Sequence, residues 1–277
     1  GSFADGWDKA ACAVLSAFLP EQRAGQANAV NLIGVTSAYY NGENDAHELM
    51  RLLALAGYHV NVALGCDMSA ADLSGLTQAA LNIVVHDELG GGAARLLAET
   101  CGMPCIAPLP PYGRAGTRKW LAEIGRVLPA PRADAAEEEI TRVTREDFLR
   151  INECKSLWGE LRYETALIRA PRSTAWGIAQ ALRTEWADVC HLAVAADAEG
   201  VPTAAPIADE ILGETDAVRI RELLNGLDGG LLIGSGNESA HINPRTAAYF
   251  PAAYPVQDAL HLSDAPFMGL RGARHIE

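Results

Sequence analysis

The sequence has few basic residues and no long apolar run, and these two shortages exclude several classes of protein. Its 277 residues include 22 Lys and Arg against 35 Asp and Glu, which gives a formal net charge of -13. Nucleic acid and anionic membrane surfaces both attract clustered positive charge, so neither is expected as a partner. The sequence contains neither an apolar run long enough for a membrane span nor a signal-peptide pattern. We therefore expect a cytoplasmic protein.

Several motifs of catalysis and metal binding are missing as well. The chain has no CxxC, no GK[ST] of a P-loop, no GxSxG and no HExxH. Among six scattered cysteines, Cys66 is the one whose place in a strand-end loop suits a metal ligand. The others in apolar settings are expected to be small buried hydrophobes, and these are Cys12, Cys101, Cys105 and Cys190.

Residues 80–117 form the most informative stretch, because they resemble two strand–loop–helix units in succession. Leu81–Val85 is short, β-branched and almost uninterrupted, which is typical of a strand buried on both faces of a parallel sheet. We expect Gly90–Gly92 to form a turn that opens the next helix, Met103–Ala107 to be a strand, and Thr117 to cap a further helix. Ligands bind at the carboxyl ends of parallel strands, so the loops of this stretch are candidate binding segments.

Strands and helices alternate over the rest of the chain too. Further buried strands are expected at Val30–Val35, Val60–Leu64, Tyr163–Arg169, Cys190–Ala196, Gly230–Ile233 and Ala253–Val256. The acidic segment Ala133–Trp158 predicts a long, exposed helix. We therefore predict an α/β fold with two doubly wound parallel-sheet (Rossmann-like) domains facing a cleft. The domains are residues 1–130 and 161–277, with a linker and the charged helix over 131–160.

His86, Asp87 and Glu88 place an imidazole and two carboxylates directly after a predicted strand. One interpretation is a functional site, in which His86 is a metal ligand or proton donor and a carboxylate orients it. The alternative is a polar turn that caps the following helix, because strand-end loops are generally polar.

Small polar loops after other strands are candidates for binding an anionic group or a cofactor. Gly91 lies in the glycine run, whose backbone N–H groups are suited to an anion or simply to a tight turn. Ser235 and Asn237 occupy a similar loop in the second half of the chain. Neither loop matches a specific nucleotide-binding motif.

Short motifs recur along the chain in a fixed order, and together they resemble a known family. They are Asn31-Leu32-Ile33-Gly34, Ala80-Leu81-Asn82-Ile83-Val84, Gly102-Met103-Pro104, Pro111-Tyr112-Gly113 and Pro266-Phe267-Met268-Gly269-Leu270-Arg271-Gly272. The order and spacing resemble nitrogenase component 1 and its relatives. Those relatives include cofactor-assembly scaffold subunits and the dark-operative protochlorophyllide and chlorophyllide reductase subunits. The resemblance covers nearly the whole chain.

This resemblance implies a particular setting for the chain. Subunits of the family have three α/β domains, and the chain resembles only the second and third, so we expect part of a longer subunit. The family's first domain supplies the cysteines of an iron–sulfur cluster, which is therefore expected in the full complex rather than in this chain. A heterotetramer with a paralogous component 1-like subunit is implied, as is an ATP-dependent iron–sulfur reductase protein that delivers electrons.

The resemblance also places two cofactor-ligand positions of nitrogenase on different residue types. The position of the cysteine ligand falls at or beside His86, and the position of the histidine ligand falls on Met268. The chain is therefore more similar to the tetrapyrrole-reductase and scaffold branches, in which the cleft would hold a tetrapyrrole or a metallocluster precursor. The residues expected to line that cavity are Tyr112, Gly113, Ser235, Asn237, Met268 and Gly269.

Three functions stay open on the sequence. The first is a fragment of a nitrogenase-like oxidoreductase subunit that reduces a tetrapyrrole or similar substrate, with protons from His86, Asp87 or Glu88. The second is a non-catalytic scaffold for metallocluster assembly in nitrogen fixation, with His86 or Cys66 as a ligand. The third is a two-domain binding protein for a small anionic ligand or a metal chelate.

Overall fold

The computed structural model describes residues 2–18, 25–196, 207–256 and 265–276, which form two compact units. The first unit contains the described residues of 1–144 together with Ala265–Ile276, and the second contains those of 145–264. None of the helices in the described part is long and apolar enough to cross a membrane.

The first unit is built on a four-stranded parallel sheet with the strand order β2-β1-β3-β4. The strands are β1 (Gln26–Ile33), β2 (His59–Leu64), β3 (Ala79–Val84) and β4 (Cys105–Ile106). The helices are α1 (Phe3–Phe18), α2 (Gly42–Leu55), the 3₁₀-helix η1 (Asp72–Gln78), α3 (Asp87–Cys101), α4 (Gly113–Val127), α9 (Gly269–Ile276) and the start of α5 (Ala133–Trp158).

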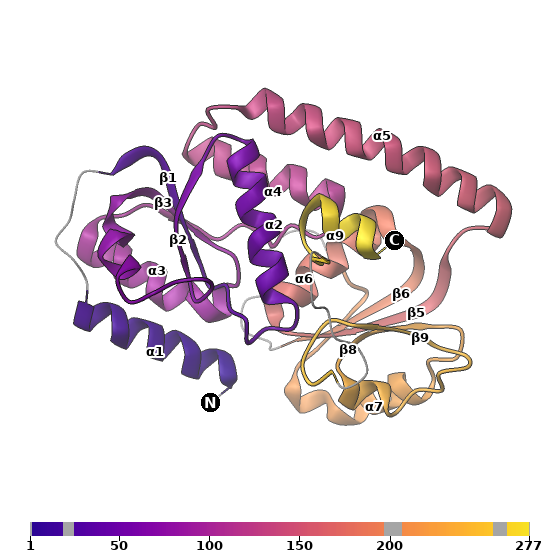
Figure 1. The fold of residues 1–277 in the computed structure, drawn as a ribbon. Helices are drawn as coiled ribbons and strands as arrows, with labels where there is room; N and C mark the ends of the chain where they lie inside the picture. Colours follow the sequence, from indigo (N-terminus) through magenta and orange to yellow (C-terminus); the bar gives the residue numbers. More distant parts are fainter. Residues whose placement is uncertain (1, 19–24, 197–206, 257–264, 277) are drawn as a thin grey trace. The chain divides into compact units, whose positions relative to one another are not determined.

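Both faces of this sheet are buried, as the apolar composition of its strands predicts. Leu32 and Ile33 are neighbours on β1 and point to opposite faces, yet both are fully buried. On one face, Ile33 packs with Leu15 of α1 and Leu97 of α3. Figure 1 shows α2 and α4 on the other side of the sheet from α1 and α3. The predicted strand at 81–85 is therefore confirmed as a central strand of a parallel sheet.

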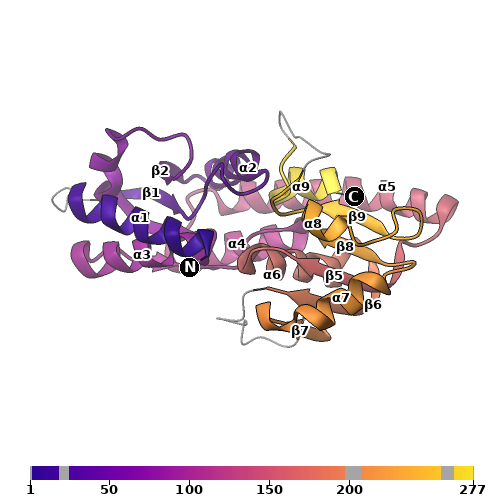
Figure 2. The same ribbon diagram turned by 90° about the horizontal axis from the view of Figure 1, so that it is seen from below.

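The second unit is built on a five-stranded parallel sheet with the order β7-β6-β5-β8-β9. In chain order its elements are β5 (Arg162–Arg169), α6 (Arg172–Ala181), the π-helix η2 (Leu182–Trp186), β6 (Asp188–Ala195), β7 (Glu210–Leu212), η3 (Glu214–Asp216), α7 (Ala217–Asn225), β8 (Leu231–Gly234), α8 (Gly236–Ser239) and β9 (Ala248–Pro251). Leu223 and Leu224 of α7 pack against the strands, and Figure 2 shows α7 alongside the sheet. Two parallel sheets with helices confirm the predicted α/β class.

The described end of the chain packs with the first unit rather than with the second. The sequence predicted that all of 161–277 forms one domain, but α9 lies against α2 and α4 (Figure 1). The physical reason is a pair of buried carboxylates on α2, Asp45 and Glu48, which accept hydrogen bonds from backbone N–H groups of 267–271. The hydrophobic periodicity of the sequence does not indicate that the last segment packs against the first unit.

The glycine run is part of a helix, so the predicted turn at Gly90–Gly92 is wrong. α3 begins at Asp87, before the glycines. A Cβ at Gly90 would lie 2.7 Å from the backbone N of Gly34, so glycine is needed for the close approach of α3 to β1. The backbone N–H of Gly92 donates to the carboxylate of Asp8 on α1, at 3.0 and 3.1 Å.

Three further local predictions differ from the structure. Thr117 lies inside α4, where its hydroxyl donates to the carbonyl of Gly113 at 2.6 Å, so it is not a cap. The last strand among the described residues is Ala248–Pro251, and Ala253–Val256 is not a strand. Cys105 and Cys190 are exposed rather than buried, because Cys105 lies on a strand at the edge of its sheet and Cys190 faces outward from β6.

Candidate functional site

The carboxyl ends of β1, β3 and β4 lie next to one another in the first sheet, and most of the predicted site residues follow these strands. His86 follows β3, and Tyr112 follows β4. The loop after β1 adds Tyr39 and Tyr40. This edge is where ligands of parallel α/β sheets bind, so the contacts of these side chains determine what the edge can hold.

His86 is buried, with a relative exposure of 4%, and lies at the N-cap position of α3. Its backbone carbonyl accepts from the N–H groups of Leu89 and Gly90 at 3.0 Å, so the residue starts α3. Its ring packs edge-on against Tyr39 with 4.9 Å between the ring centroids. Burial disfavours the imidazolium and lowers the pKa of His86, against the opposing charge of Glu88. The ring is therefore neutral at pH 7.

Glu88 joins this pair. The hydroxyl of Tyr39 donates to Oε1 of Glu88 at 3.3 Å. Asp87 is exposed in the first turn of α3, where a carboxylate is favoured by the helix dipole. The structure therefore assembles His86, Glu88 and Tyr39 at the end of β3. The sequence did not single out Tyr39, because only the fold brings the β1 loop next to His86.

The predicted residues at 112–113 and 268–269 come together although they lie far apart in the sequence. Tyr112 and Met268 form an antiparallel bridge, and the N–H of Gly269 donates to the carbonyl of Pro111 at 2.8 Å. Gly113 and Gly269 have φ angles of 73° and 74°, a conformation that favours glycine. This explains physically why glycine stands at both positions of the predicted motifs.

Asp45 holds the 267–268 segment in place and was not predicted as a site residue. Its Oδ1 accepts from the N–H groups of Phe267 at 2.6 Å and Met268 at 2.8 Å. Burial disfavours the carboxylate and raises the pKa of Asp45 to about 7, although the two N–H groups act in the opposite direction. A carboxyl group that titrates near neutral pH can hold or release a proton under physiological conditions.

The contacts around Asp45 are connected to those around His86 through Phe267 and Tyr40. The ring of Phe267 lies 5.7 Å from that of Tyr40, which directly follows Tyr39. Asp45, the 267–268 backbone, the two tyrosines and His86 thus form a connected series of contacts along the sheet edge. Asp45 lies in the first turn of α2, which follows the N-cap residue Asn41, and its burial is not visible in the sequence.

Two other predicted residues have surroundings that do not favour ligand binding. Cys66 is buried, and burial together with the charges of Asp67 and Glu43 raises the pKa of its thiol to about 11. A metal ligand is the thiolate, so Cys66 is poorly suited to this role at neutral pH. Gly91 is buried inside α3, where the carboxylate of Asp87 lies 2.7 Å from the position of a Cβ.

Ser235 and Asn237 lie in the second unit, where the structure gives them a local role. The hydroxyl of Ser235 accepts from the N–H of Asn237 at 3.2 Å and donates to the carboxylate of Glu238. Ser235 and Glu238 form a capping box at the start of α8. The side chain of Asn237 is exposed. Their part in binding a cofactor stays a prediction.

The cysteines of this chain do not fit an iron–sulfur cluster. All six lie in the described residues, and none of them belongs to a group of three neighbouring metal-ligating side chains there. Such clusters are held by several thiolates at one place. The described residues therefore do not form a site for such a cluster by themselves.

Comparisons with known proteins agree with this architecture. A family model described as "Nitrogenase component 1 type Oxidoreductase" matches residues 1–276. The chain is similar to the B subunit of light-independent protochlorophyllide reductase from Nostoc punctiforme (28% identity over 263 residues) and from Gloeobacter violaceus (26% over 266 residues). Each alignment covers 89% of this chain and 50% of the relative, so the chain spans about half the length of these relatives.

The structural comparison supports the same fold. A solved structure of nitrogenase Cp1 at pH 5 superimposes with a TM-score of 0.75, covering 99% of this chain and 60% of that one. The sequence identity in this superposition is 17%, so the likeness concerns the fold alone.

Proposed function

Because the chain belongs to the nitrogenase component 1 type oxidoreductases, we propose that it is part of a subunit of a nitrogenase-like reductase that acts on a tetrapyrrole or a similar conjugated ring. The observation that carries this proposal is the similarity to protochlorophyllide reductase B subunits over 89% of the chain. It is supported by the presence of His86 and Met268 where the sequence resemblance expects the cysteine and histidine ligands of a nitrogenase cofactor.

The proposal includes partners for the complete protein. A paralogous subunit completes a heterotetramer, and an ATP-dependent iron–sulfur protein supplies electrons. The iron–sulfur cluster that receives them is held outside this chain, since the cysteines here are dispersed.

Reduction of a carbon–carbon double bond adds two electrons and two protons, so the site must supply protons. His86 is a proton-donor candidate: its neutral ring takes up a proton as the imidazolium and then gives it to the substrate. Glu88 favours that charged form, and Tyr39 holds Glu88 and the His86 ring in their relative positions. Asp45 is a second candidate, because its carboxyl group carries a proton over much of the range below about pH 7.

The test is an anaerobic assay of the complete protein together with its paralogous subunit and the ATP-driven reductase. Protochlorophyllide is the first substrate, and products are identified by absorbance and mass spectrometry. We expect formation of a product two hydrogens heavier that depends on both ATP and the reductase. A protein that binds a metallocluster but reduces no tetrapyrrole would instead be a scaffold, and binding of a small chelate alone would indicate a carrier.

A further inference from the structure

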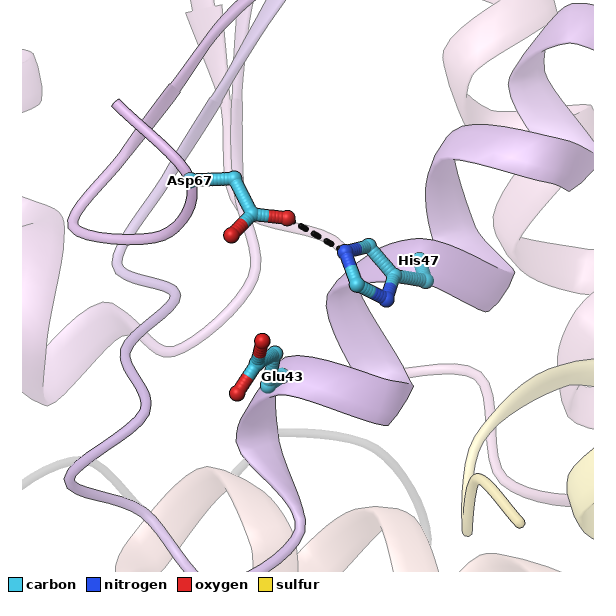
Figure 3. Close-up of side chains that lie close together, drawn as sticks. All are labelled: Glu43, His47 and Asp67. Atoms are coloured by element: carbon cyan, nitrogen blue, oxygen red, sulfur yellow. Dashed lines mark hydrogen bonds and ion pairs between the residues drawn. The ribbon is translucent and has the colours of Figure 1, made fainter. Parts of the chain in front are cut away.

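A group of three potential metal ligands lies at another part of the same sheet edge, between the ends of β1 and β2. Glu43 and His47 are one turn apart on α2, and Asp67 lies in the loop after β2. Figure 3 shows their side chains directed towards a common space. One imidazole nitrogen of His47 is hydrogen-bonded to Oδ2 of Asp67. No two-histidine motif marks this set in the sequence, so it was not predicted.

The spacing of the three side chains suits a single cation. One donor atom from each residue lies within 4.8 Å of the others. Two ligands bound at 2.0–2.2 Å to the same ion are at most about 4.4 Å apart. Because all three side chains are exposed, small rotations are enough to close the remaining gap, and water has access to the other coordination positions.

The negative charge of the two carboxylates also favours a cation. In the part of the chain that the structure describes, neither Glu43 nor Asp67 forms an ion pair with a lysine or arginine. A bound divalent cation would neutralise both groups and replace the hydrogen bond between His47 and Asp67.

We propose that Glu43, His47 and Asp67 form a binding site for a first-row divalent cation of the Zn²⁺, Co²⁺ or Mn²⁺ type. An imidazole with two carboxylates and open water positions is typical of these ions, whereas Mg²⁺ and Ca²⁺ prefer oxygen ligands alone. The ion would cross-link the loop after β2 to the first turns of α2. The site is separate from the His86 cluster and does not depend on the proposed reductase activity.

The experiment titrates the metal-free 277-residue chain with Co²⁺ and follows the visible absorption of the ion, with Zn²⁺ competition measured by calorimetry. Exposed cysteines are the main competing ligands (Cys105, Cys154 and Cys190). Thiolate ligation gives a strong charge-transfer band, which carboxylate and imidazole ligation does not give. The variants are H47Q, E43Q and D67N, and the control is H59Q, since His59 is exposed on the same unit but outside the group.

We expect one Co²⁺ per chain without a thiolate band, displacement by Zn²⁺, and binding at least 100-fold weaker for Mg²⁺ and Ca²⁺. H47Q should weaken binding at least tenfold, E43Q and D67N should also weaken it, and H59Q should not change it. Unchanged binding in H47Q, a thiolate band, or no binding by the wild-type chain would each overturn the proposal. Circular dichroism of each variant verifies that the fold is retained.

Discussion

The carboxyl group of Asp45 is buried under the backbone of Phe267 and Met268. This burial determines the pH at which the group becomes charged. Its pKa in the folded chain, about 7, lies above the ordinary value of 3.8. Between these two values the folded state keeps a proton that the unfolded state has lost. Proton binding by the folded state therefore stabilises the fold at low pH, and this contribution declines as the pH rises towards 7.

The variant D45N tests this effect. It keeps an oxygen acceptor for the two N–H groups but cannot titrate. The wild-type free energy of unfolding should fall, relative to that of D45N, by up to about 1.4 kcal/mol per pH unit between roughly pH 4 and 7. Denaturant unfolding at several pH values measures it. D5N alters an exposed carboxylate on α1, and its free energy of unfolding should depend on pH as that of the wild type does. If the free energies of unfolding of D45N and the wild type changed in parallel with pH, the raised pKa of Asp45 would be contradicted.

At the residue scale, the sequence could indicate His86 but not its surroundings. The polar residue after an apolar strand is visible in the chain, and its place at a strand end follows from the parallel sheet. The contact with Tyr39 depends on the exact path of the loop after β1, and the burial of Asp45 depends on a segment more than 200 residues away. Long-range contacts of this kind leave no local pattern.

At the scale of elements, the first turn of α3 approaches the end of β1 so closely that backbone atoms meet, in addition to the side-chain packing of Leu97 with Ile33. Gly34 and Gly90 make this possible, since a Cβ at Gly90 would lie within 3 Å of Gly34 and of the Ile33 side chain. The starting residue of α3, His86, is positioned by the same contact, because a Cβ at Gly34 would lie 2.5 Å from its carbonyl oxygen. The glycines therefore fix the helix that carries His86.

G90A should destabilise the chain by about 1–3 kcal/mol, because the new methyl group meets backbone atoms that cannot move away easily. The matched control is G125A on α4, where a Cβ would have no neighbour within 4 Å. This control should be neutral or gain about 0.5–1 kcal/mol from its better helix propensity. Chemical denaturation of both variants measures the difference, and equal effects of the two substitutions would refute the packing argument.

The glycine run shows why an element can be predicted while its boundary is missed. Glycine is common in turns, so Gly90–Gly92 predicted a loop, and the hydrophobic residues that follow predicted the helix correctly. Local propensity was overridden by the tertiary contact with β1 and by the Asp8 carboxylate on Gly92. By contrast, Ala133–Trp158 was predicted with the observed bounds of α5, because a long charged helix has a clear composition.

At the scale of the molecule, the end of the chain stabilises the unit that contains its beginning. Phe267, Met268 and Leu270 are almost fully buried in the first unit. Burial of three such side chains contributes about 5–9 kcal/mol before the entropic cost of ordering the segment. The segment also satisfies the buried carboxylates of Asp45 and Glu48.

Removal of residues 265–277 should therefore weaken the first unit selectively. Hydrogen exchange is expected to become faster in β1 and β3, whereas β5 and β6 of the second unit keep their protection. Mass spectrometry of peptides from both sheets measures this. Uniform loss of protection, or loss confined to the second sheet, would show that the two units are divided differently from the structure.

We propose that the edge of the first sheet around His86 carries out the reduction, and the direct test is the ATP-dependent turnover of an H86Q variant. The variant is measured in the complete protein with its partners, beside E99Q, an exposed substitution on the same helix. We expect H86Q to lower turnover at least tenfold and to remove the rise in rate towards low pH that a His86 imidazolium donor would give. The turnover of E99Q and the thermal stability of both variants should equal those of the wild type. Turnover by H86Q equal to that of the wild type, with the same pH profile, would contradict the proposal.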